Sequence, residues 1–197
     1  MRRVPQSDRL LEAVCRRRAV SDCTDRTPSD SVIRSLIETA DWEPSGVNLQ
    51  PWRFVVVDDP IVLAACSTEA TAETLGQADV HLELAQMREM LNSPKFNNFY
   101  NAPILVVICA TTPEDMALKD CCLAAQTLML AAHAEGLGSC WIGFPEAWLN
   151  TSAARARLGI PAEFQPVAPI IVDHLKAPIP ATERRAPDIR HVLAGRS

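Results

Sequence analysis

The chain has 197 residues, of which 48% are hydrophobic and 22% charged, and these proportions exclude disordered and collagen-like proteins. Its 19 basic and 24 acidic residues give a net charge of −5 without a long basic stripe, which disfavours nucleic-acid binding. No apolar run reaches the roughly 18 residues of a membrane-spanning helix, and no apolar stretch follows the basic start as in a signal peptide. We therefore expect a cytoplasmic protein that binds neither nucleic acid nor membranes.

The cysteines and histidines do not predict a metal site. The seven cysteines form no CxxC pair and the four histidines show no HExxH spacing, so we expect neither a disulfide framework nor a metal centre. Cys121 and Cys122 are adjacent in an apolar stretch. We expect both to be buried packing residues, the alternative being a reactive pair.

The first third of the chain predicts two helices and a strand. A helix is expected from Ser7 into the arginines at 16–18, because apolar residues at helical spacing follow a serine that can cap it. A second helix is expected over residues 32–40, where apolar residues recur at i, i+1, i+4, i+5 and i+8, until Pro44 stops it. Residues 53–58 are rich in β-branched and aromatic residues and predict a buried strand.

The rest of the chain continues to alternate between helices and strands. In chain order it predicts a helical region at 61–92, a strand at 104–110, a helix at 114–135, a strand at 139–142, a helix at 146–158 and a strand at 167–172. The helix at 114–135 is apolar on nearly every side, so we expect it to be the central buried helix. With no repeat or linker, the pattern predicts one α/β domain over residues 1–197, an α+β sandwich whose mixed sheet is flanked by helices.

Residues 44–54, PSGVNLQPWRF, are the most informative segment for function. Ser45, Asn48 and Gln50 can both donate and accept hydrogen bonds, as the polar edge of a flavin ring requires, and Gly46 allows close backbone approach. The alternative is an ordinary loop, because Pro, Ser, Gly and Asn are also the common turn residues.

Three further segments could bind a ligand, and each has an ordinary explanation. The arginines at 16–18 could hold an anion or simply complement the end of a helix. Arg184 and Arg185 offer planar guanidinium groups that suit a phosphate. In GLGSCWIGF, residues 136–144, Gly143 could leave its N–H free for a ligand, although a plain helix-to-strand connection also explains the segment.

The order of these segments along the chain resembles the nitroreductase family of FMN-dependent α/β oxidoreductases. The resemblance covers the chain from about Leu10 to His191 and is carried by four motifs in matching order. These are RRAV near the start, PSGVNLQPWRFVVV, an Ala/Leu-rich helix followed by GLGSCWIGF, and RRAP near the end. A P-loop or dinucleotide fingerprint is absent.

The resemblance implies that FMN lies in a crevice at a homodimer interface. Arg17, Arg18 and the backbone of Ala19 are assigned to the phosphate and ribityl end of the cofactor. From the tail, Arg185, together with Arg184, would neutralise the same phosphate.

The resemblance also assigns residues to the flavin ring. Pro44, Ser45, Gly46, Asn48 and Gln50 would come largely from the partner subunit and line the ring and the ribityl chain. Ile142 and Gly143 would lie beside the reactive edge, with the Gly143 N–H bonded to flavin N5.

The function implied by the resemblance is FMN-dependent reduction of nitroaromatic, quinone-like or enone-like acceptors. NADH or NADPH would give a hydride to flavin N5 and be replaced by the acceptor, in ping-pong kinetics that need no catalytic side chain. The alternatives are a flavin-binding or sequestering protein with little turnover, or a specialised flavin dehydrogenase, dehalogenase or flavin-cleaving enzyme. Phe96, Phe99 and Tyr100 could stack on an acceptor or pack in the core.

Two positions depart from the family pattern. Ser21 stands where the family usually has a basic residue, whose loss could cost about 1.5 to 3 kcal/mol of cofactor affinity. Asp173 stands where the family commonly has glycine, and its charge would be unfavourable close to a phosphate, although harmless at the surface.

Overall fold

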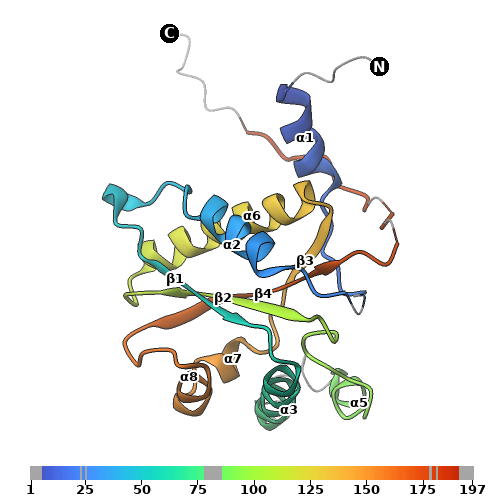
Figure 1. Cartoon of the computed structure of the whole chain (residues 1–197), viewed down its shortest axis with the longest axis vertical. Helices are drawn as coiled ribbons and strands as arrows, with labels where there is room; N and C mark the ends of the chain where they lie inside the picture. The colour runs from blue at the N-terminus through green and yellow to red at the C-terminus, as the bar shows by residue number, and fades with distance from the viewer. Residues whose placement is uncertain are drawn as a thin grey trace.

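The computed structural model shows a four-stranded sheet between two layers of helices (Figure 1). It describes residues 6–22, 24, 26–77, 86–177, 179–180 and 182–190. The strands are β1 (Trp52–Val57), β2 (Ile104–Ala110), β3 (Leu137–Trp141) and β4 (Gln165–His174), in the order β1-β2-β4-β3. All three strand pairs are antiparallel, so the mixed sheet that we expected is present only through an isolated parallel bridge between Ala19 and Ser139.

The sheet is buried on both faces. Every residue of β2 is buried, and side chains alternate between a cluster that includes Val106 and Ile108 and a cluster on the opposite face that includes Leu105 and Val107. The continuous apolar run at 104–110 is the sequence pattern that such a strand requires. The α/β sandwich predicted from the sequence is therefore confirmed.

Helices α2 (Asp30–Ala40) and α6 (Asp115–Ala134) cover one face of the sheet (Figure 1). One side of α6 packs into the core through small and apolar residues such as Ala124 and Leu128. Its opposite side is exposed, with Met116 at 56% and Leu123 at 46% of their full exposure. The predicted central buried helix is confirmed on the core side of α6, whereas its opposite side is an exposed apolar surface.

Helices α3 (Pro60–Gln77), α5 (Arg88–Leu91), α7 (Glu146–Leu149) and α8 (Ser152–Leu158) lie on the other side of the sheet (Figure 1). The single helix predicted over 146–158 is divided because Thr151 starts a new one. Its hydroxyl oxygen accepts a hydrogen bond from the Ala154 N–H, as an N-cap does. Part of the helical region predicted at 61–92, residues 78–85, lies outside the described residues.

Helix α1 (Gln6–Arg16) projects beyond the layer formed by α2 and α6 (Figure 1). Ser7 lies inside this helix, so its predicted role as the cap was wrong. Leu10 and Leu11 are exposed on α1. The tail at 182–190 is extended, without helix or strand.

The cysteines divide by burial. Cys66, Cys109 and Cys121 are buried, whereas Cys122 is exposed, so the expected burial of Cys122 was wrong. The cause is the helical step of 100° per residue, which carries Cys122 out of the core side of α6. Burial raises the pKa of the Cys66 thiol to about 11 and those of Cys109 and Cys121 to about 12.

These raised pKa values predict that the protein loses stability in alkali. Above pH 9.0, the ordinary value, an unfolded thiol releases its proton while the buried thiol keeps it, so the free energy of unfolding falls between about pH 9 and pH 12. Urea unfolding at pH 8 and at pH 10.5 measures this slope. Cys109→Ala should flatten it, and an unchanged slope in that variant would contradict the assignment.

Candidate functional site

The arginines at the end of α1 line a cavity of about 480 Å³ beside β3. The segment after the helix is held against the strand by the Ala19–Ser139 bridge, in which the Val20 N–H donates to the Ser139 carbonyl at 3.0 Å. The cavity is lined by Arg16, Arg17, Arg18, Val20, His133, Leu137, Ser139, Leu175, Lys176, Ala177 and Ile179. Cations from both ends of the chain therefore meet at one hollow.

The three arginines differ in what they bind. Arg16 forms an ion pair with Glu12 at 3.1 Å, and the Arg18 guanidinium donates to the carbonyls of Cys15 and Arg17. The side chain of Arg17 makes no hydrogen bond or ion pair within the described part of the chain. Burial raises the pKa of the Cys140 thiol on β3, and the Arg17 charge acts against that shift. Arg17 is thus the guanidinium available to an anion in this cavity.

Ser139 adds a buried polar group to the same cavity. The residue is 3% exposed, and its hydroxyl oxygen has no hydrogen-bond partner among the described residues. Most buried hydroxyls are hydrogen-bonded, so an unpaired one calls for a physical explanation. A polar ligand in the cavity would supply the missing partner.

Asp173 lies neither at the surface nor in the arginine cavity, the two environments considered from the sequence. It is 2% exposed rather than at the surface, and its carboxylate accepts hydrogen bonds from the backbone N–H groups of Thr24 and His174 and from the Thr24 hydroxyl. These bonds tie the segment that follows the arginines to the end of β4. Asp173 therefore serves the local structure, and it does not line the arginine cavity.

Lys176 is a cation that the sequence analysis did not single out. It lines the arginine cavity and pairs with Asp22 at 2.8 Å, one residue after the exposed Ser21. A lysine in a tail gives no sequence signal by itself, because only the fold brings it to the end of α1. Ser139 likewise gave no signal within GLGSCWIGF.

The PSGVNLQPW motif forms a strained loop between α2 and β1. It contains the short 3-10 helix η1 (Gly46–Asn48), and Val47, Asn48 and Gln50 have φ values of 47°, 57° and 47°. Left-handed φ is rare for a β-branched residue such as valine and marks strain that the surroundings must support. Inside the loop, the Gln50 N–H donates to the Ser45 hydroxyl at 2.9 Å.

The tip of this loop is apolar and exposed. Val47 is 93% exposed, and Leu49 is exposed beside it. An ordinary turn would place polar residues at such a tip. The loop therefore presents both hydrogen-bonding groups and an apolar surface outward from the chain.

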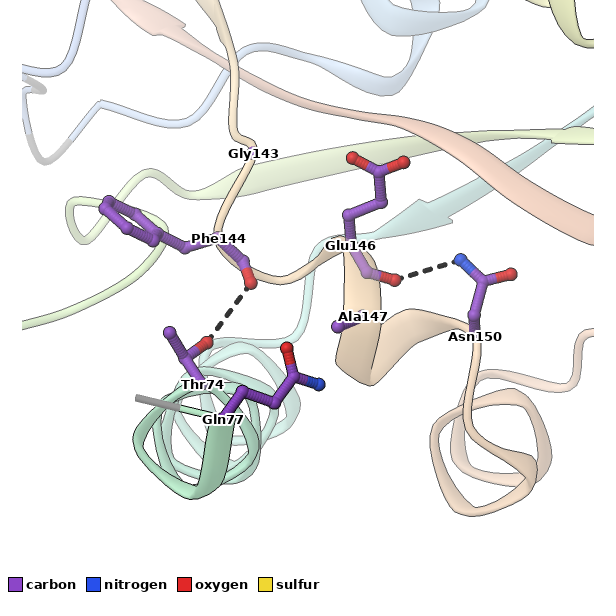
Figure 2. A pocket seen from close by; sticks show the side chains of 7 residues that line it. All are labelled: Thr74, Gln77, Gly143, Phe144, Glu146, Ala147 and Asn150. Atoms are coloured by element: carbon purple, nitrogen blue, oxygen red, sulfur yellow. Dashed lines mark hydrogen bonds between the residues drawn. The ribbon is translucent and has the colours of Figure 1, made fainter. Parts of the chain in front are cut away.

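A second cavity, of about 570 Å³, lies at the loop after β3 (Figure 2). Thr74, Gln77, Gly143, Phe144, Glu146, Ala147 and Asn150 line it, and the Thr74 hydroxyl donates to the Phe144 carbonyl at 3.2 Å. Ile142 is buried directly before it. A Cβ added at Gly143 would meet nothing within 4 Å, so a ligand has access to this backbone.

The aromatic residues before β2 take different positions. Phe99 is buried in the core, whereas Tyr100 is partly exposed. The Phe96 ring packs edge-on against the ring of Phe144, with centroids 6.4 Å apart. Phe96 therefore packs on Phe144, a residue that lines the second cavity.

The assigned residues occupy three places in the chain. Arg17 and Arg18 line the arginine cavity beside Ala19, Gly143 lines the second cavity after Ile142, and the PSGVNLQPW loop lines neither. Arg184 and Arg185 are exposed and line neither cavity. The tail contributes Lys176, Ala177 and Ile179 to the arginine cavity, and the Pro180 carbonyl accepts a 3.4 Å hydrogen bond from Arg18.

No described helix is long and apolar enough to cross a membrane. Within the described residues, no group of three or more His, Cys, Asp or Glu side chains is placed to hold a metal ion.

The fold matches that of solved nitroreductases, and the chain belongs to the nitroreductase family. It matches the model of the Nitroreductase family over residues 14–172. A stretch of 159 residues is 33% identical to the "Putative NADH dehydrogenase/NAD(P)H nitroreductase" of Archaeoglobus fulgidus and covers 78% of each chain.

Two further comparisons show how the family varies. A stretch of 170 residues is 31% identical to the 5,6-dimethylbenzimidazole synthase of Rhodospirillum rubrum, covering 79% of this chain and 77% of that protein. The crystal structure of a nitroreductase with bound FMN from Desulfitobacterium hafniense superimposes with a TM-score of 0.78 at 26% identity. That match covers 93% of this chain and 98% of the other.

Proposed function

We propose that this protein is an FMN-dependent oxidoreductase built as a single domain over residues 1–197. The observation that carries the proposal is that the Arg17 guanidinium and the buried Ser139 hydroxyl line one cavity, and that neither has a hydrogen-bond partner among the described residues. A phosphate joined to a polyol chain offers acceptors for the guanidinium and a partner for the hydroxyl. The FMN bound by the Desulfitobacterium relative supports this choice of ligand.

The residues of the chain fit FMN as follows. Arg17 and Arg18 would hold the phosphate with the Ala19 backbone, and Arg184 and Arg185 would approach it from the tail. Strand β3 leads from Ser139 to Gly143, at most about 13 Å away at about 3.3 Å per residue. Ile142 and Gly143 would border the ring, with the Gly143 N–H directed toward its reactive edge. When bound, FMN supplies the redox chemistry, taking two electrons from NADH or NADPH and passing them to the acceptor.

We also propose that two copies of the chain build each site. Exposed apolar residues lie on α1, on α6 and at the loop tip, namely Leu10, Leu11, Met116, Leu123 and Val47. Exposed apolar side chains that gather on one part of a surface are typical of a protein interface. Pairing of two copies would cover it and bring Pro44, Ser45, Gly46, Asn48 and Gln50 of the partner subunit to the ring and the ribityl chain.

The acceptors that we propose are nitroaromatic, quinone-like or enone-like small molecules. The name of the Archaeoglobus relative supports NAD(P)H as the reductant. The second cavity, which Gly143 lines, supplies room for an acceptor beside the proposed position of the ring edge. No side chain in this cavity needs to act as a nucleophile, because the flavin would carry the redox chemistry and the residues of the chain would orient the reactants.

Flavin binding and its reduction test the proposal directly. The purified protein should be yellow or take up FMN, and the flavin absorbance should bleach when NADH or NADPH is added without oxygen. A nitroaromatic or quinone acceptor should then restore the absorbance. Failure to bind FMN under varied conditions would overturn the proposal, and binding without reduction by either nicotinamide would favour the flavin-sequestering alternative.

The Rhodospirillum relative is named a 5,6-dimethylbenzimidazole synthase, so a specialised member of the family, such as a flavin-cleaving enzyme, is our second candidate. The two candidates differ in what happens to the flavin after reduction. Reoxidation in air should restore the full flavin absorbance for an oxidoreductase. Irreversible loss of that absorbance over repeated cycles, with a new product in mass spectrometry, would identify the second candidate.

A further inference from the structure

The PSGVNLQPW loop, residues 44–52, is hydrogen-bonded to a buried carboxylate on α6. Asp120 is 4% exposed, and its Oδ2 atom accepts a hydrogen bond from the Gly46 N–H at 3.1 Å. No ion pair to Asp120 occurs within the described part of the chain. Among the described residues, the hydrogen bond from the Gly46 N–H is therefore the interaction that offsets the cost of removing the Asp120 carboxylate from water.

The position of Asp120 is unusual for its helix. It faces the core side of α6, next to the buried Cys121, in a stretch where small apolar residues fill the other buried positions. An apolar residue there would avoid the desolvation cost of a carboxylate. Packing alone consequently does not explain why an aspartate occupies this site.

The loop needs support at this point because its conformation is strained. Left-handed φ values begin at Val47, directly after Gly46. The loop also lies tightly on α6, since a Cβ added at Gly46 would be 3.1 Å from the Met116 Cγ atom. The two ends of the motif are fastened separately: the Thr127 hydroxyl donates to Glu43, the residue before the motif, and the indole N–H of Trp52, its last residue, donates to Asp41 at 2.7 Å.

We propose that Asp120 is a positioning residue that fixes the PSGVNLQPW loop in its flavin-binding conformation. This inference rests on the proposed function, because the loop would act on FMN bound with the partner subunit. Asp120 acts through the Gly46 backbone and does not itself touch the cofactor. Without the hydrogen bond from Gly46 to Asp120, the loop backbone would leave its left-handed φ values. The polar groups of Ser45, Asn48 and Gln50 would then no longer be held in one arrangement.

Two substitutions at one position separate the hydrogen bond from the charge. Asp120→Ala removes both, whereas Asp120→Asn keeps an oxygen that can accept from the Gly46 N–H. Ser67→Ala is the matched control. It removes the hydroxyl of a residue that is 3% exposed and lies on the opposite side of the sheet. That hydroxyl accepts a hydrogen bond from the Asn98 backbone N–H at 2.9 Å.

The variants are compared by FMN titration, by visible circular dichroism of the bound flavin and by hydrogen exchange of the flavin-free protein. Asp120→Ala should raise the dissociation constant of FMN about tenfold and change the flavin dichroism, whereas Asp120→Asn should stay within about threefold of the parent. The peptide covering residues 44–50 should exchange faster in Asp120→Ala than in Asp120→Asn. Ser67→Ala should lower the melting temperature without moving any of these three readouts.

The outcomes that would overturn the inference are distinct from failure of the proposed function. Parent-like FMN binding and exchange in Asp120→Ala would show that the loop does not depend on this residue. If Asp120→Asn lost FMN as severely as Asp120→Ala, the charge rather than the hydrogen bond would be responsible. If the parent protein bound no FMN, the proposed function would fail, whereas the exchange experiment would still decide whether Asp120 holds the loop.

Discussion

Arg17→Ala is expected to weaken FMN binding roughly tenfold to hundredfold. This range corresponds to the loss of one hydrogen-bonded charge pair, about 1.5 to 3 kcal/mol. Arg17 should have the largest effect of the three arginines, because Arg16 and Arg18 are already engaged with Glu12 and with backbone carbonyls. Titration of the flavin-free protein with FMN, followed by the quenching of flavin fluorescence, measures the change.

Arg34→Ala is the control for the loss of one positive charge. Arg34 is exposed on α2 and does not line the arginine cavity, so FMN affinity should remain within about twofold. Arg17→Lys should fall between the parent and Arg17→Ala, since lysine keeps the charge without the planar fork. Equal effects at Arg17 and Arg34 would show that the cavity is not the phosphate site.

Gly138→Ala is expected to destabilise the fold by about 1 to 3 kcal/mol and to impair FMN binding as well. A Cβ at position 138 would lie 2.7 Å from the Val20 Cγ1 atom and 2.9 Å from its Cβ, too close for either to remain in place. Val20 follows the arginines and donates to the carbonyl of Ser139. The added methyl group would therefore push the arginine segment away from β3.

Gly76→Ala is the matched control for this substitution. Gly76 lies inside α3, where an added Cβ would meet nothing within 4 Å, so alanine should stabilise the helix by up to about 1 kcal/mol. Urea unfolding gives the change in stability, and FMN titration at low temperature gives the binding of the folded fraction. A Gly138→Ala protein as stable as the parent would contradict the close packing of Val20 on β3.

The fold could be predicted largely from local patterns. The strand expected at 104–110 coincides with β2, because a fully buried strand leaves an unbroken apolar run rich in β-branched residues. The helix expected at 114–135 agrees with α6 to within one residue at each end. The division between α7 and α8 was missed, because the capping role of Thr151 depends on where the preceding turn ends.

The candidate site was predictable only in part, because it combines groups that are far apart in the sequence. The motifs indicated Arg17, Gly143 and the PSGVNLQPW loop, and the structure shows what surrounds each of them. Lys176 and Ser139 enter the arginine cavity through strand pairing and the course of the tail, which no local pattern records. The sequence signal of Asp120 is its helical spacing from Ala117 and Ala124 on the core side of α6, which the neighbouring charge of Lys119 obscures.

The pairing of β3 with β4 makes the two ends of the proposed cofactor site mechanically dependent on each other. Ser139 lies opposite Val172 and Cys140 opposite Ile171, and the same strand leads directly into Gly143. A slip of one residue in this register would turn the Ser139 hydroxyl to the opposite face and displace Gly143 by about 3.3 Å. A change in length between positions 139 and 143 would therefore alter the spacing between the two cavities, whereas the tail beyond Ile179 can vary in length without changing that spacing.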